Sequence, residues 1–296
     1  MLATWDDHEL VNDSGGPELN RGPSPEELAR DPQLSASDPS RPRNVHKQRQ
    51  GVFHNPGLFQ AGRQVMYEYN PIRVLPDPSG LFDRRLYRHF RWGAHAEVIM
   101  LDTRSYRDPR YRFDTAEQPK TMLGPVQKQW LKDVLVQSDA TWKIIVSSVP
   151  LASEGGNERD PQKRVYRDSW ARGEASNPYG YMRELTELVT FMRERRVANV
   201  LFLSGDHHFT NLYSFDPDGD GTPDFYEANV GPLRSGPSSG RRLEKTLNPT
   251  VLFSDAGRAT FSYGQLVIDS AGRLTVEMRG VDGATFPDAR LQLEPR

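Results

Sequence analysis

Two kinds of hydrophobic pattern alternate along the first two-thirds of the chain. Apolar residues spaced three or four positions apart are typical of amphipathic helices, and this spacing predicts helices over Leu58–Tyr69, Pro125–Val136 and Met182–Arg193. Shorter segments rich in apolar and aromatic residues are typical of strands. They predict strands over Arg85–Trp92, Ala94–Asp102, Trp142–Val149 and Ala198–Leu203. The alternation of helix and strand predicts a fold of the α/β class.

The last third of the chain has a different pattern. From Leu212 onward, short strand-like segments predict a mostly antiparallel sheet. These segments are Phe225–Val230, Thr260–Ile268 and Leu274–Arg279. By contrast, residues 12–56 carry seven prolines among many Ser, Gly, Asn and Asp residues, a composition that predicts a long irregular insertion. The chain shows no internal repeat of fixed period. Residues 1–296 are predicted to form a single domain.

The composition narrows the function classes. Lys and Arg total 38 against 40 Asp and Glu, the net charge is −2, and no basic stripe stands out, so binding to a nucleic-acid scaffold is not predicted. The chain has no cysteine, which excludes disulfides, Cys-ligated zinc and a thiol nucleophile. No segment reaches the roughly 20 apolar residues that cross a bilayer, and the first residues lack the pattern of a signal peptide.

One cluster of polar side chains lies close to the start of the chain. Asp6, Asp7, His8 and Glu9 place three carboxylates and an imidazole in four residues, directly after the strand-like segment Leu2–Trp5. Carboxylates bind Mg²⁺, Ca²⁺, Mn²⁺ or iron, and imidazole binds zinc or iron. A metal site and a solvated polar turn are both open interpretations of this cluster.

A second cluster follows a strand that the pattern marks as buried. Ser204 and Gly205 lead into Asp206, His207 and His208, and the glycine permits a close approach of the backbone. Ligands at a strand end often line a binding site. A pair of surface histidines is the alternative. Because both clusters follow strand-like segments, we expect them to meet at one edge of the sheet.

Four motifs occur in an order that resembles one enzyme family. They are Trp5–Glu9, Leu101–Arg107, the helix and strand within Leu123–Val146, and Leu203–His208. Together they resemble the PhoD-like alkaline phosphatase and phosphodiesterase family of calcineurin-like metallophosphoesterases. The resemblance extends from about Trp5 to Ile268. It implies an α/β sandwich of mixed β-sheets flanked by helices, and metal-dependent hydrolysis of phosphoesters.

The resemblance also implies roles for individual residues. Asp7 matches a metal ligand, and His8 matches the histidine that donates to the phosphate or the leaving group. Asp206 and His208 match the late metal-binding block, and Asp168 is similar to an acidic residue near the metals. The ions are divalent or trivalent, and the residues do not distinguish Ca, Fe, Mn and Zn. The implied substrate is a small phosphoester, either monoester or diester, or a phospholipid-type molecule, and the implied location is the periplasm or the cell exterior.

One departure from the family pattern concerns the start of the chain. In the family, an early Asp with its neighbouring ligand and a Gly-Asp-x-x-Tyr segment precede the motif that here begins at Trp5. The resemblance therefore leads us to expect a fold that is incomplete at its N-terminus, with a missing upstream segment and weak or absent catalysis. The alternative function is a non-catalytic, calcium-stabilised scaffold or binding protein derived from the same fold.

Two arginines offer a contact for the phosphate. Arg104 and Arg107 follow Asp102 at the end of a predicted strand. A guanidinium can hold a phosphate through two parallel hydrogen bonds, so Arg104 is a candidate phosphate contact. Pairing with nearby carboxylates is the other interpretation.

A third constellation occupies residues 216–227. Oxygen-bearing residues at positions 1, 3, 5, 7, 9 and 12, with glycine at position 6, match the spacing of a twelve-residue calcium loop. These residues are Asp216, Asp218, Asp220, Thr222 through its carbonyl, Asp224 and Glu227. The flanking segments are predicted strands rather than EF-hand helices, so the spacing predicts a calcium ion between two strands. An acidic turn without an ion is the alternative.

Overall fold

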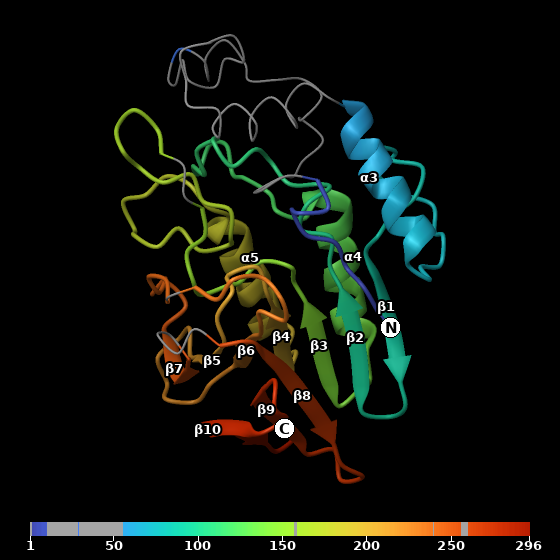
Figure 1. The fold of residues 1–296 in the computed structure, drawn as a ribbon, viewed down its shortest axis with the longest axis vertical. Helices are drawn as coiled ribbons and strands as arrows, with labels where there is room; N and C mark the ends of the chain where they lie inside the picture. Colours follow the sequence, from blue (N-terminus) through green and yellow to red (C-terminus); the bar gives the residue numbers. More distant parts are fainter. Residues whose placement is uncertain (1, 11–28, 30–55, 157–158, 239, 256–259) are drawn as a thin grey trace.

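The computed structural model describes residues 2–10, 29, 56–156, 159–238, 240–255 and 260–296 (Figure 1). A seven-stranded mixed sheet carries two helices on one face and a three-stranded antiparallel sheet on the other. This arrangement confirms the predicted α/β sandwich. The predicted insertion at 12–56 lies outside the described residues, apart from Ala29 and Pro56.

The three predicted helices are present. They are α3 (Pro56–Tyr69), α4 (Gly124–Gln137) and α5 (Met182–Glu194). The large sheet contains β1 (Arg88–Trp92), β2 (Ala96–Met100), β3 (Trp142–Val146), β4 (Val200–Ser204), β5 (Asn211–Phe215), β6 (Phe225–Asn229) and β7 (Pro249–Ser254). The small sheet contains β8 (Ser262–Ile268), β9 (Leu274–Gly280) and β10 (Thr285–Leu293). None of the described helices is long and apolar enough to cross a membrane.

The strand order determines which chain segments meet. The large sheet runs β1-β2-β3-β4-β6-β5-β7, and the contacts β2 to β3, β3 to β4 and β4 to β6 are parallel. β1, β5 and β7 pair antiparallel with their neighbours. The carboxyl ends of the central parallel strands therefore lie along one edge of the sheet, where side chains from distant parts of the sequence are brought together.

Alternating side chains of the central strands build the two cores. In β3, Ile145 packs with the helices, while Trp142 and Ile144 pack against the small sheet. This period of two explains why β3 is apolar at every position except Lys143: both of its faces are covered. The indole Nε1 of Trp142 also donates to the Gly272 carbonyl at 2.7 Å, which ties the small sheet to the large one.

Three features differ from the pattern-based expectation. The sequence pattern did not mark β7 or β10, because β7 is mostly exposed and β10 contains a proline and an irregular register. The segment Leu2–Trp5 is not a strand. A hydrogen bond from Thr4 Oγ1 to the Leu101 carbonyl, at 2.9 Å, holds it beside the end of β2. Side-chain bonds therefore replace sheet pairing in this segment.

A buried carboxyl joins α5 to the turn before α4. Glu184 accepts hydrogen bonds from the backbone N–H of Met122 (2.8 Å) and of Leu123 (3.3 Å). Burial raises the pKa of Glu184 from its ordinary 4.5 to about 7, although hydrogen bonds from Thr121 and the two backbone donors act against this rise. The carboxyl therefore changes charge near neutral pH.

Glu184→Gln is expected to flatten the dependence of stability on pH. Because the folded pKa lies above the unfolded value, the contribution of Glu184 to the free energy of unfolding is fully present below about pH 4.5. It is lost as the pH rises through about 7, by roughly 3 kcal/mol. Urea unfolding at about pH 5 and pH 8 should show a larger loss in the wild type than in the variant. Equal losses would contradict the assignment.

Candidate active site

The carboxyl ends of parallel strands form the edge at which the polar motifs meet. β2 is followed by Asp102, and β4 is followed by Gly205 and Asp206. Asp102 is fully buried and shapes its own turn, because its Oδ1 accepts the backbone N–H of Arg104 (3.1 Å) and of Ser105 (2.8 Å). These hydrogen bonds fix the backbone conformation at Arg104.

The amino-terminal segment adds two carboxylates to this edge. Trp5 is buried, its Nε1 donates to Asp102 Oδ1 at 2.9 Å, and its ring packs edge-on against Phe59 of α3 with centroids 5.2 Å apart. The anchored indole brings the next two residues, Asp6 and Asp7, to the strand ends. Asp7 is buried, and Asp6 is partly exposed.

Asp6, Asp7 and Asp206 form a three-carboxylate cluster. Each offers one oxygen, and the three oxygens lie within 4.8 Å of one another. Burial raises the pKa of Asp6 to about 6; Asp7 and Asp168 add to the rise, while Arg104 opposes it. Burial, with the charge of Asp6, also holds the pKa of Asp206 well above its ordinary value. Bringing three carboxylates this close is unfavourable unless a cation lies among them.

Arg104 places a positive charge against the cluster. Its guanidinium is buried, donates from Nε to Asp6 Oδ1 at 2.7 Å, and donates from Nη1 to Asp168 Oδ2 at 2.8 Å. Nη2 lies 3.8 Å from Asp206 Oδ1. Of the two interpretations of Arg104, the structure therefore favours pairing with carboxylates over a phosphate contact.

Asp168 lies behind Arg104 rather than in the carboxylate cluster. Arg104 and Arg107 both donate to its carboxylate, the latter from Nη2 to Oδ1 at 2.7 Å, and the side chain is 1% exposed. Burial raises the pKa of Asp168, but the charges of Arg104 and Arg107 outweigh that effect and hold it well below its ordinary value. The expected metal-ligand role is therefore not the one that the structure favours, because two guanidiniums occupy its oxygens.

His8 stands at the rim of the cluster. Its side chain is 70% exposed, and Nε2 lies 4.0 Å from Asp7 Oδ2. The structure thus places His8 beside the carboxylates but open to solvent, a position from which it can meet a bound ligand. Its role as a proton donor remains a proposal.

The two adjacent histidines differ in environment. His208 makes a 2.9 Å contact from Nδ1 to the Gly236 carbonyl and does not join the cluster within the part of the chain that the structure describes. His207 is 3% exposed, its Nδ1 lies 3.0 Å from Ser153 Oγ, and its Nε2 lies 3.5 Å from Asp206 Oδ2. Burial lowers the pKa of His207 to about 3, so its imidazole is neutral.

Two residues of this site, Asp6 and His207, lie in the clusters predicted from the sequence but were not assigned individual roles there. Asp6 and Asp7 are neighbours with the same side chain, and only the fold shows that both reach the cluster. His207 and His208 are also identical neighbours. The backbone conformation determines which of them lies beside Asp206. Asp206 and His208 have φ angles of 68° and 58°, in the left-handed region, so the chain turns sharply on either side of His207. No sequence signal reports that turn.

The acidic loop after β5 is closed by its own side chains. Asp216 accepts backbone N–H groups from Gly219 (2.9 Å), Asp220 (3.1 Å) and Gly221 (2.9 Å). Arg193 of α5 pairs with Asp218 and also with Asp224, at 3.1 Å from the latter. Oxygens of Asp216, Asp218 and Asp220 lie within 4.8 Å of one another, so these three remain the candidate calcium ligands.

Glu227 does not belong to this loop. It lies in β6 and is fully buried; its carboxylate accepts the backbone N–H of Leu151 (2.8 Å) and Ala152 (3.1 Å) and the hydroxyl of Ser204 (2.7 Å). The twelfth position of the predicted calcium loop is therefore wrong. The strand begins at Phe225, and its period of two turns Glu227 into the protein.

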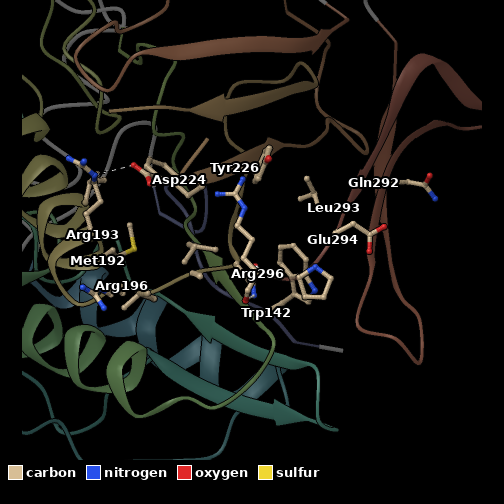
Figure 2. Close-up of a pocket in the computed structure, with 17 residues that line it drawn as sticks. Trp142, Met192, Arg193, Arg196, Asp224, Tyr226, Gln292, Leu293, Glu294 and Arg296 are labelled. Atoms are coloured by element: carbon tan, nitrogen blue, oxygen red, sulfur yellow. Dashed lines mark hydrogen bonds and ion pairs between the residues drawn. The ribbon is translucent and has the colours of Figure 1, made fainter. Parts of the chain in front are cut away.

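A large cavity lies at the opposite edge of the sheet. It measures about 590 Å³ and is lined by residues that begin β3, β4 and β6, together with Arg193 and Arg296 (Figure 2). None of the candidate metal ligands of the carboxylate cluster lines it. The cavity therefore plays no part in the site at the carboxyl ends of the strands.

Comparison with known proteins decides the family. The family model of the PhoD-like phosphatases matches residues 1–277. The chain belongs to the PhoD-like phosphatase family. Alkaline phosphatase D of Bacillus subtilis (strain 168) is 29% identical over 217 residues, which cover 70% of this chain and 30% of that protein.

The PhoD-like assignment is also consistent with the fold. A solved structure of PhoD aligns with 99% of this chain and 51% of its own, with a TM-score of 0.63 and 22% sequence identity. The chain thus spans about half of that protein and less than a third of the Bacillus relative. The solved structure of PhoD therefore shares its fold with this chain.

The described residues fit a bound cation. Three carboxylate oxygens converge, as hard cations require. Beside them, the buried Nε2 of His207 has no hydrogen-bond partner among the described residues. A cation would also offset the cost of burying the negative charges of Asp6 and Asp206. The donor set therefore suits the metal that the PhoD-like resemblance implies.

Proposed function

We propose that this chain carries the site of a metal-dependent phosphoester hydrolase that acts on small phosphomonoesters or phosphodiesters, including phospholipid-type molecules. The observation that supports the proposal most directly is the cluster of Asp6, Asp7 and Asp206 at the carboxyl ends of the parallel strands. Family membership supports the same reaction class. Location in the periplasm or outside the cell is part of the proposal and rests on the resemblance alone.

Each residue of the cluster has a distinct task in this proposal. Asp6, Asp7 and Asp206 would hold the metal, and a metal bound there would supply polarisation of the phosphoryl oxygens and a lowered pKa, toward about 7, for a water molecule. Arg104 fixes the orientation of the Asp6 carboxylate through its 2.7 Å hydrogen bond. His8, exposed at the rim, donates a proton to the leaving group. In-line attack of water on the phosphorus atom would then depend on how the site positions the substrate and stabilises its developing charge.

The test uses the purified chain with an aryl phosphomonoester and an aryl phosphodiester. After removal of metals by a chelator, Mn²⁺, Zn²⁺, Fe³⁺ and Ca²⁺ are added back singly. Because the family's early metal-binding segments do not precede Trp5 in this chain, we expect weak metal-dependent hydrolysis. Asp7→Asn should abolish it, and Asp139→Asn should leave it unchanged, because the Asp139 side chain is 92% exposed and outside the cluster. Binding of no metal, or hydrolysis insensitive to both the chelator and Asp7→Asn, would overturn the proposal.

The acidic loop supports a second candidate, a calcium-stabilised scaffold. In this proposal Asp216, Asp218 and Asp220 bind Ca²⁺ beside Arg193. Stabilisation follows RT ln(1 + [Ca²⁺]/Kd), about 2.7 kcal/mol at a hundredfold excess over Kd.

We expect millimolar calcium to raise the thermal unfolding midpoint of the wild type and to leave the midpoint of Asp220→Ala unchanged. Asp139→Ala serves as a control for the loss of an exposed carboxylate. A calcium response that is the same in the wild type and in Asp220→Ala, or absent from both, would identify the loop as an acidic turn closed by Asp216.

A further inference from the structure

The large cavity at the amino-terminal edge of the sheet is separate from the carboxylate cluster. It measures about 590 Å³ and lies between α5, the first residues of β3, β4 and β6, and the chain segment after β10 (Figure 2). A volume of several hundred Å³ is typical of cavities that bind a small organic molecule. Since none of the proposed metal ligands of the cluster lines it, a molecule bound there would occupy a second site.

One side of the cavity is apolar and aromatic. Trp142 and Phe225, each 1% exposed, contribute rings from the first residues of β3 and β6, and Val200 is the first residue of β4. The polar atom of the indole, Nε1, already donates to the Gly272 carbonyl. Trp142 therefore offers the cavity an apolar ring, against which another aromatic ring packs well in an offset or edge-on arrangement.

The opposite side carries guanidinium groups. Arg193 and Arg196 lie across the cavity from Trp142 and Leu293 (Figure 2). Arg193 is already paired, since its Nε lies 3.1 Å from Asp224 Oδ2. Within the part of the chain that the structure describes, the guanidinium of Arg196 makes neither an ion pair nor a hydrogen bond. Arg196 therefore supplies a positive charge that a bound anion can neutralise.

The turn between α5 and β4 places Arg196 at the cavity. The Arg193 carbonyl accepts the backbone N–H of Arg196 at 3.0 Å, and the Met192 carbonyl accepts that of Val197 at 2.8 Å. These carbonyls at the end of α5 are therefore satisfied without the side chain of Arg196. Arg196 and Asn199 adopt φ angles of 52° and 58°, which residues other than glycine rarely adopt. Such costly backbone shapes cluster at ligand-binding sites.

A second guanidinium reaches the cavity from the segment after β10. Asn199 Nδ2 donates to the Arg296 carbonyl at 3.2 Å, and Asn199 Oδ1 accepts the Arg296 N–H at 2.9 Å. The Arg296 side chain extends toward Tyr226, and its Nη1 donates to the Pro223 carbonyl at 2.8 Å (Figure 2). Among the described residues, no carboxylate pairs with this guanidinium, so Arg296 adds positive charge close to the aromatic side chains.

We propose that this cavity binds a small aromatic anion, a carboxylate or a phosphate, with its ring against Trp142 and its charge on Arg196. Glu294, the other acidic residue of the lining, pairs with Arg273 and leaves these guanidiniums to the ligand. A guanidinium binds a carboxylate or a phosphate through parallel hydrogen bonds. This binding requires neither the carboxylate cluster nor a metal.

The first experiment measures binding to the purified chain by calorimetry in the presence of a metal chelator. The probes are 2-naphthoate and 2-naphthyl phosphate, which carry a ring and a negative charge, and 2-naphthamide, which carries the same ring without a charge. We expect a Kd of about 1 mM or tighter for at least one anion and at least about fivefold weaker binding of the amide. The tighter of the two anions identifies the anionic group.

The variants are Arg196→Gln and its matched control, Arg195→Gln. Each removes one exposed guanidinium from the same turn, but Arg195 lies outside the cavity lining and packs over Phe191, with 5.7 Å from its Cζ to the ring centroid. We expect Arg196→Gln to weaken binding of the anion at least about fivefold, and Arg195→Gln to change it less than about twofold. Thermal unfolding midpoints check that both variants are folded.

A second measurement needs no substitution. In ¹⁵N-labelled wild-type chain, the indole N–H of Trp142 and the side-chain amide of Asn199 should shift on addition of the anion. The backbone N–H of Asp206, at the opposite edge of the sheet, should stay in place. This measurement locates the bound probe even when a variant does not fold.

The outcomes separate this inference from the proposed hydrolase. Preference for an anion over the amide, lost in Arg196→Gln and kept in Arg195→Gln, supports the inference. Equal binding of the three probes, equal affinities of the two variants, no binding at several millimolar, or shifts confined to the carboxylate cluster would overturn it. Hydrolysis is measured with added metal and depends on Asp7, so either proposal can fail while the other stands.

Discussion

Asp206→Asn is expected to lower kcat/KM for metal-dependent phosphoester hydrolysis at least about a hundredfold, which corresponds to roughly 3 kcal/mol of lost transition-state stabilisation. Asp206 belongs to the three-carboxylate cluster, and its second oxygen faces His207. Asparagine is the suitable replacement because position 206 has a φ of 68°, which asparagine tolerates better than alanine. The measurements are steady-state kinetics and metal content after gel filtration.

Asp139→Asn is the matched control for Asp206→Asn. It removes one carboxylate whose side chain is 92% exposed and which lies outside the cluster. The control should keep the kinetics and the metal content of the wild type. Wild-type kcat/KM in Asp206→Asn, at equal metal content, would exclude the cluster as the catalytic centre.

Asp168→Asn is expected to lower the free energy of unfolding by about 3 kcal/mol. The substitution keeps the shape of the side chain, removes its charge and replaces one acceptor oxygen with an NH₂ donor. Arg104 and Arg107 would then lie buried without the carboxylate that both contact. A buried charge that loses an ionised partner is destabilised, whereas an exposed ion pair contributes little. Urea unfolding at neutral pH measures the difference.

The control for this prediction is again Asp139→Asn, whose partner Arg91 is partly exposed. Its free energy of unfolding should stay within about 0.5 kcal/mol of the wild-type value. The wild type should also lose stability in acid, since the folded pKa of Asp168 lies below its ordinary value of 3.8. That contribution is present above the ordinary pKa and is lost as the pH falls through the folded value. A loss below 1 kcal/mol in Asp168→Asn would contradict the prediction.

The sequence pattern predicted the elements that have a strong hydrophobic period. α3, α4 and α5 each lie within a few residues of the predicted bounds, and so do the central strands β2, β3 and β4. The edge strand β7 and the irregular β10 could not be predicted in this way, because neither buries a regular set of apolar side chains. Both are defined by their pairing with β5 and β9, which the local sequence does not specify.

The candidate site was predictable as a place and less so as a set of residues. Because both motifs follow strand-like segments, the sequence correctly predicted that Asp7 and Asp206 lie close together. The calcium-loop spacing wrongly placed Glu227 in the loop, because this spacing does not show where β6 begins or which of its side chains are buried. The motif resemblance placed Asp168 near the metals, and it could not show that two arginines occupy its carboxylate.

The anchoring of Trp5 has a consequence for the cohesion of the whole chain. Two of the three clustered carboxylates stand on a segment without strand pairing, and the third follows β4, about two hundred residues further along. An ion bound by all three therefore acts as a cross-link that closes a loop of that length. Such a closure lowers the conformational entropy of the unfolded chain. This loss of entropy grows with the logarithm of the loop length. Loading the site would then hold the amino-terminal segment against the end of β4, as a covalent bridge does in a chain that has cysteines.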